Sequence, residues 1–103
     1  MATLDFEVSS YGRDKGRGAA TLQATTVVAS GQDTITTVEN IEDAAGDITV
    51  SKGQVFSAMA DAKMRISFGG VAATATTGLI LPANVLRQWE GTEGGTVSAV
   101  EAT

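Results

Sequence analysis

The chain has 103 residues, the size of one domain, and carries a formal net charge of −5 at pH 7. This acidity opposes a general role in binding nucleic acid or an anionic membrane, because both of these are negatively charged. The chain contains no cysteine and no histidine, which excludes disulfides, thiolate metal sites and catalysis that depends on either residue. We therefore expect a single domain that is not an enzyme and needs no cofactor.

The sequence supplies little material for a core. Sixteen of its hydrophobic residues are alanine, and a domain of this size buries only about 60–65% of its unfolded surface. We therefore expect partners to contribute to its stability. The apolar stretch at residues 78–83 is far shorter than the roughly 20 residues of a membrane span. The N-terminus lacks a basic stretch followed by an apolar one, so we expect no secretory signal.

Residues 3–9 alternate between apolar and polar side chains, with Leu4, Phe6 and Val8 on one face and acidic or hydroxyl residues on the other. A period of two predicts a strand with one buried face.

A glycine-rich and charged segment follows at residues 10–18. Arg13, Lys15 and Arg17 against Asp14 give it a local charge of +2, which leaves −7 for the rest of the chain. Its glycines predict a mobile, solvated loop. The alternative is a basic arm that docks on an acidic neighbour, so the three basic residues are candidate docking residues for a partner.

Residues 20–29 are rich in threonine and valine, which favour strands. Residues 30–33 have the composition of a turn, and alternation resumes over residues 34–38. We therefore predict two strands separated by a turn.

The acidic run at residues 39–47 predicts a loop, with room for one short helical turn. Its residues Glu39, Glu42, Asp43 and Asp47 could in principle supply a glycosidase pair or calcium ligands. Their spacing is not that of a calcium-binding loop. The favoured interpretation is a solvated acidic turn, and no metal site is predicted.

Residues 55–64 are ambiguous, because their alanine and methionine content also allows a helix of about ten residues. We favour two short strands around a turn at residues 60–62, because residues 63–68 alternate clearly. The residues expected to face inward there are Met64, Ile66 and Phe68. The other predicted strands are 48–50, 74–77, 78–81, 85–89 and 96–100, and the other predicted turns are 51–54, 69–70, 82–84 and 91–95.

Turn signals thus recur about every 8–12 residues, which is typical of sandwiches and barrels. The predicted fold is all-β: one domain over residues 1–103, a small antiparallel β-sandwich or jelly-roll-like barrel of about six to eight short strands. Trp89 could serve as a stacking platform for a sugar or base, but a core or interface anchor is favoured. It remains a candidate docking residue. The expected core or buried-contact residues are Phe6, Ile66, Phe68, Leu79, Leu81 and Trp89.

The C-terminal part has motifs of a recognisable kind. Residues 64–70 (MRISFGG) lead through an Ala/Thr-rich stretch at 73–78 to residues 79–84 (LILPAN), and residues 95–100 (GTVSAV) form a final strand. This succession, over roughly residues 62–101, resembles small structural proteins of tailed bacteriophages.

The resemblance implies a virion component, most plausibly a decoration or cement protein that binds the outside of the capsid and stabilises it. Its partners would be the major capsid protein or another virion protein, and further copies of itself on the lattice. Its location would be the capsid surface, and the host cytoplasm during assembly. The alternatives are another virion accessory, such as a head fibre base or a tail or baseplate part, and a small carbohydrate-binding β-sandwich.

Overall fold

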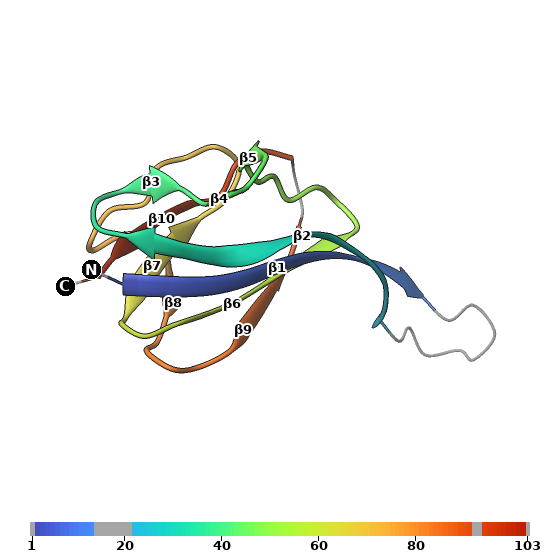
Figure 1. The fold of residues 1–103 in the computed structure, drawn as a ribbon, viewed down its shortest axis with the longest axis horizontal. Coiled ribbons are helices and arrows are strands. Elements are labelled where there is room, and N and C mark those ends of the chain that lie inside the picture. The colour runs from blue at the N-terminus through green and yellow to red at the C-terminus, as the bar shows by residue number, and fades with distance from the viewer. Residues whose placement is uncertain (1, 14–21, 92–93, 103) are drawn as a thin grey trace.

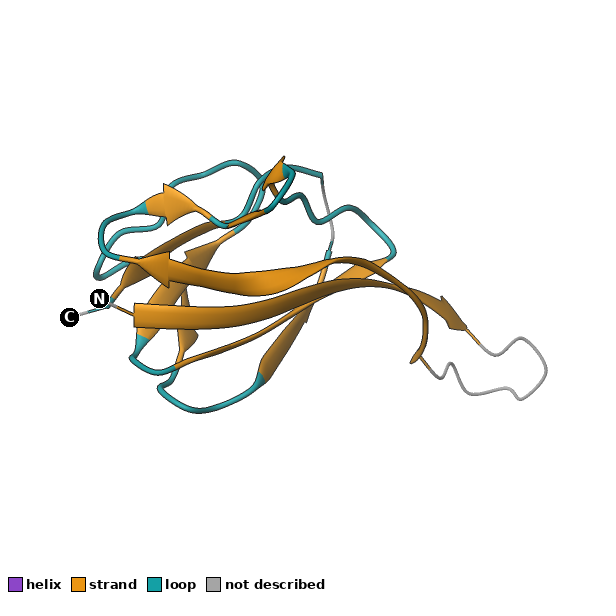
Figure 2. Ribbon diagram, viewed as in Figure 1, coloured by secondary structure: helices purple, strands orange, loops and turns teal. Residues whose placement is uncertain are grey.

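The computed structural model describes residues 2–13, 22–91 and 94–102, with the side chains of residues 11–13 and 22–26 left out. All regular secondary structure in these residues is β (Figure 2). The prediction of an all-β fold is therefore confirmed. The same residues include no helix that is long and apolar enough to cross a membrane.

The strands form two four-stranded antiparallel sheets and a small hairpin (Figure 1). The first sheet has the order β2 (Leu22–Ile35), β1 (Ala2–Arg13), β6 (Gln54–Ala60) and β9 (Arg87–Glu90). The second has the order β3 (Glu39–Asn40), β10 (Ser98–Glu101), β7 (Met64–Ser67) and β8 (Leu79–Leu81). The hairpin consists of β4 (Glu42–Asp43) and β5 (Gly46–Asp47).

The core lies between the two sheets, as in a β-sandwich. Alternation along β1 buries the side chains of Leu4, Phe6 and Val8, as the sequence predicts. From the second sheet, Met64 and Ile66 of β7 join the same buried cluster. The other buried members are contributed by both sheets and the connections between them: Ala2, Ile35, Ile41, Ile48, Val50, Phe56, Ala58, Ala60, Leu81, Val97 and Ala99.

The ambiguity at residues 55–64 is resolved in favour of two strands. β6 ends at Ala60 and β7 begins at Met64. Within the connection, the Asp61 backbone N–H donates to the Thr3 carbonyl of β1 (3.2 Å). The predicted inward positions of Met64 and Ile66 are fully buried, and Phe68 is partly buried against the core.

Two predicted boundaries near the N-terminus are wrong. Residues 30–33 are not a turn, because β2 continues through them to Ile35. Gly31 lies opposite Phe6 on β1, and a side chain there would come within 3.3 Å of the Phe6 ring. The glycine therefore makes room for an aromatic ring within a strand. Likewise, residues 10–13 belong to β1 and not to a loop, while the rest of the predicted loop, residues 14–18, lies outside the described residues.

Two further predictions are corrected around residues 74–79. Residues 74–77 form a tight turn instead of a strand, closed by hydrogen bonds from Thr74 N to Thr77 O (3.1 Å) and from Thr77 N to Thr74 O (3.3 Å). Leu79 is 43% exposed, although it was expected in the core. β8 lies at the edge of the second sheet, where Leu79 has a neighbouring strand on one side only.

The hairpin of β1 and β2 projects beyond both sheets (Figure 1). β1 pairs with β6 only from Leu4 to Ser10, and from Tyr11 onward it pairs with β2 alone. Two register shifts near Val8 and Ser10 give β2 an extra residue at each, and such bulges bend a strand pair. We call this projection, with residues 11–13 and 22–25 as its described backbone, the arm.

Candidate interaction surfaces

The structure places one of the predicted basic docking residues at the far end of the arm. Arg13 is the last residue of β1, and its backbone pairs with Leu22 of β2. Lys15 and Arg17 lie outside the described residues, in the segment that joins these two strands. The basic residues therefore fall at the end of β1 and in the segment that joins β1 to β2.

Trp89 lies at the edge of the core. It sits opposite Phe56 in the register of β6 and β9, with the two rings stacked at a centroid distance of 6.2 Å. The Phe68 ring approaches it edge to face at 5.9 Å. The side chain is partly buried against the core cluster. Trp89 thus anchors β9 to the core, the role that sequence analysis favours over a sugar-stacking platform.

The acidic run at residues 39–47 forms β3 and the β4–β5 hairpin, with no helical turn. Its carboxylates accept hydrogen bonds within the run: Asp43 from the Ala45 backbone N–H (2.8 Å) and Asp47 from the Asn40 side-chain amide (3.1 Å). No group of three acidic residues in the described part of the chain is placed to hold a metal ion.

The pKa of the Glu39 carboxyl is raised above its ordinary value, first by partial burial and then by the neighbouring charges of Asp33 and Glu42. Asp33 reaches the hairpin as well, because its carboxylate accepts a hydrogen bond from the Glu42 backbone N–H (3.2 Å). The region is therefore a structured acidic turn with some like-charge repulsion.

A second acidic surface covers the outer side of the first sheet. Alternation along β1 turns Asp5 and Glu7 outward. The register places Asp5 beside Met59 on β6 and Gln32 on β2, and it places Glu7 beside Ser57 and Ser30. Side chains of cross-strand partners share a face. None of the described residues at these outward positions is basic.

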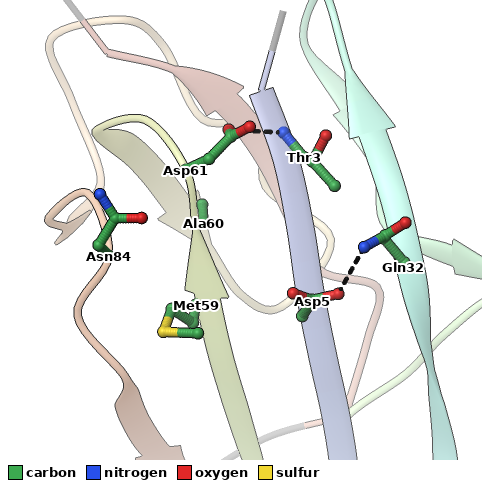
Figure 3. Close-up of a pocket in the computed structure, with 7 residues that line it drawn as sticks. All are labelled: Thr3, Asp5, Gln32, Met59, Ala60, Asp61 and Asn84. Carbon is green, nitrogen blue, oxygen red and sulfur yellow. Dashed lines mark hydrogen bonds between the residues drawn. The ribbon is translucent and has the colours of Figure 1, made fainter.

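Two adjoining hollows open on this outer side. The larger, of about 410 Å³, is drawn in Figure 3 and is lined by Thr3, Asp5, Gln32, Met59, Ala60, Asp61 and Asn84. The smaller, of about 200 Å³, is lined by Asp5, Phe6, Glu7, Ser57, Met59 and Leu86. Because Asp5 and Met59 line both, the two hollows are neighbours along β1 and β6. We call the surface formed by Asp5, Glu7, Asp61, Met59 and Leu86 the acidic face.

Local hydrogen bonds hold all three carboxylates of the acidic face in place. Glu7 accepts from the Ser9 hydroxyl at 2.8 Å, and the bonds of the other two are drawn in Figure 3. One oxygen of Asp61 accepts the Thr3 backbone N–H at 2.8 Å, and one oxygen of Asp5 accepts the Gln32 side-chain amide at 3.0 Å. Each carboxylate has a second oxygen that can accept from a bound donor. Asn84 is held at the rim by a bond from its backbone N–H to the Ala60 carbonyl (2.7 Å), with a positive φ of 60°.

The acidic face is not evident from the sequence alone. The alternation of Asp5 and Glu7 is visible in the sequence, but Asp61 joins them only through the pairing of β1 with β6. Leu86 precedes β9 and reaches the face because β9 pairs with β6.

No protein-family model, no curated protein and no solved structure matches this chain. The fold itself defines a small antiparallel β-sandwich with a projecting two-stranded arm.

Proposed function

We propose that this chain is a structural protein of a tailed-phage virion, which decorates the outside of the head and stabilises it without catalysing a reaction. The observation that carries the proposal is the arm. It projects from the sandwich, and the segment that joins its strands is the basic part of an acidic chain. A projecting hairpin can reach a neighbouring subunit that the sandwich alone does not touch.

The resemblance of residues 62–101 to small phage structural proteins supports the same proposal. In a decoration protein the partner is the major capsid protein, and many copies occupy equivalent lattice positions. Contacts that are individually weak then combine into stable attachment, because each bound copy raises the effective concentration of the next contact.

A position elsewhere on the virion is the second candidate, because the same arm could reach a neighbour in a tail or baseplate. A carbohydrate-binding module is less well supported. Trp89 was the suggested sugar platform, and its ring is engaged by Phe56 and Phe68.

The test is co-sedimentation of the purified chain with heads stripped of accessory proteins, and separately with tails. We expect saturable binding to heads that weakens as salt is raised, since exposed charge pairs are screened within about 8–10 Å at physiological salt. Binding to tails alone would establish the second candidate. Binding to neither particle would overturn the proposal.

The matched variant replaces Arg13, Lys15 and Arg17 with serine. We expect this variant to keep its fold and to bind heads more weakly, with a flatter dependence on salt. Equal occupancy by variant and parent at every salt concentration would mean that the basic segment takes no part in attachment.

A further inference from the structure

We propose that the acidic face of one copy binds the basic segment of a second copy, residues 13–17, so that copies associate head to tail. The inference deepens the proposed function by naming one neighbour that the arm contacts. It concerns the chain free in solution, and its test needs no virus particle.

Charge is the first argument. The acidic face presents Asp5, Glu7 and Asp61, and the described outward positions of β1, β2 and β6 beside Asp5 and Glu7 carry no basic residue. The basic segment carries a charge of +2, while the remainder of the chain carries −7. Two copies therefore attract most strongly when the basic segment of one meets an acidic surface of the other.

Spacing is the second argument. Arg13, Lys15 and Arg17 occupy every second position, so all three point to the same side when the segment is extended. Successive side chains on that side are about 6.6 Å apart in extended backbone. Asp5 and Glu7 also occupy every second position of a strand, so they have the same spacing. Two successive cations can thus pair with two successive carboxylates without distortion of either backbone.

The third argument concerns the apolar part of the face. Met59 is 40% exposed and Leu86 is 62% exposed, and both line the smaller hollow beside Asp5 and Glu7. The aliphatic stems of lysine and arginine pack on such surfaces while their charged ends remain at the rim. Asp61, at the far side of the larger hollow, offers an oxygen to a third cation.

The described part of the arm lies far from the acidic face of its own copy. Arg13 is six residues beyond Glu7 on β1, a separation of about 20 Å along a strand. The arm also projects away from the start of β1 (Figure 1), where Thr3 and Asp5 line the larger hollow. The occupant to which we commit is therefore a second copy.

Such an interface joins two different surfaces, so a pair of bound copies leaves one arm and one face free. Contacts of this kind close into a ring or continue as an open chain, depending on the rotation between copies. On a capsid this arrangement would link neighbouring decoration subunits to one another as well as to the shell.

The experiment is sedimentation velocity of the full chain over a concentration series. We expect the parent to self-associate at about 0.01 M salt and to be monomeric at about 1 M salt, where the screening length falls from about 30 Å to about 3 Å. The basic variant has Arg13, Lys15 and Arg17 replaced with serine. The face variant combines Asp5→Asn with Glu7→Gln. Each should raise the dissociation constant more than tenfold.

A control separates the site from the overall charge. Glu42→Gln combined with Asp47→Asn removes two carboxylates from the β4–β5 hairpin and gives the same net charge as the face variant. We expect this control to associate like the parent. If the control loses association to the same extent, or if the parent is monomeric at low salt, the inference is overturned.

A mixture of the basic variant and the face variant gives the decisive result. The basic variant keeps an intact face and the face variant keeps an intact basic segment, so an equimolar mixture should form a 1:1 dimer that grows no further. Failure of the mixture to associate, with both variants shown to be folded by circular dichroism, would also overturn the inference. Neither outcome depends on whether the chain binds heads, so the proposed function is judged separately.

Discussion

Phe56 occupies the centre of a small aromatic cluster. Its side chain is fully buried, and its ring lies 6.4 Å from Phe6, 5.7 Å from Phe68 and 6.2 Å from Trp89, measured between centroids. We predict that Phe56→Ala lowers the free energy of unfolding by about 3–5 kcal/mol, because it removes the ring and leaves a cavity. Urea unfolding followed by circular dichroism measures this. Leu86→Ala, at an exposed position, should change stability by less than about 0.5 kcal/mol, and a similar loss in both variants would contradict the assignment of the core.

Glu39 gives a prediction about pH. Its pKa is raised from 4.5 by burial and by repulsion from Asp33 and Glu42, so the folded chain holds this proton more tightly than the unfolded chain does. Ionised Glu39 therefore destabilises the fold at neutral pH, and the penalty disappears as the pH falls below 4.5. We expect Glu39→Gln to have a higher Tm than the parent at pH 7. The two Tm values should converge at acidic pH, and a gap independent of pH would show that the effect is not electrostatic.

At the scale of elements, the turn that follows β7 packs against the segment that precedes β10, and two glycines allow this close approach. Gly95 has a φ of 135°, and a Cβ there would lie 2.8 Å from the Gly69 carbonyl carbon. We predict that Gly95→Ala costs about 1–3 kcal/mol, because it combines backbone strain with a steric clash. Gly94→Ala is the matched control, since its Cβ would have no atom within 4 Å. Thermal melts of the two variants should differ clearly, and equal Tm values would place the strain elsewhere.

The sequence predicts some strands and turns better than others, for physical reasons. β7 was predicted correctly because Lys63 to Phe68 alternates, and alternation reports directly on which face is buried. The turn predicted at residues 30–33 failed because Gly31 serves a ring on the neighbouring strand, a contact that local composition does not record. The strand predicted at residues 74–77 failed because threonine favours both strands and tight hydroxyl-bonded turns.

The same contrast holds for the candidate surfaces. The basic segment was visible as a local excess of charge in the sequence. The acidic face was not, because it requires the register that sets Asp5 beside Met59 and brings Asp61 to Thr3. Register between distant strands is set by burial of the whole sheet, so a single sequence does not reveal it.

At the scale of the whole molecule, we predict that the sandwich folds without the arm. Among the described residues, no fully buried core residue lies between Val8 and Ile35. We predict that replacing residues 12–23 with an Asn-Gly turn, which joins Tyr11 to Ala24 in a short hairpin, leaves a cooperative fold. The Tm should change by less than about 8 °C, the equivalent of about 1 kcal/mol in a domain of this size. Co-sedimentation with heads should be lost. Loss of the cooperative melt would mean that the arm takes part in folding the sandwich.

The first and last described residues lie on the side of the sandwich away from the arm (Figure 1), because Thr3 bonds to Asp61 and Ala102 bonds to Lys63, two residues further along the chain. β1 begins there with Ala2 paired to Ile35, and the Ala102 backbone N–H donates to the Lys63 carbonyl at 2.9 Å. Domains with adjacent ends tolerate circular permutation. A short linker between the ends, with a new opening in the β4–β5 hairpin, should preserve both sheets. For the same reason, a peptide or enzyme fused at either end would be displayed opposite the arm, which makes the sandwich a scaffold for presenting cargo.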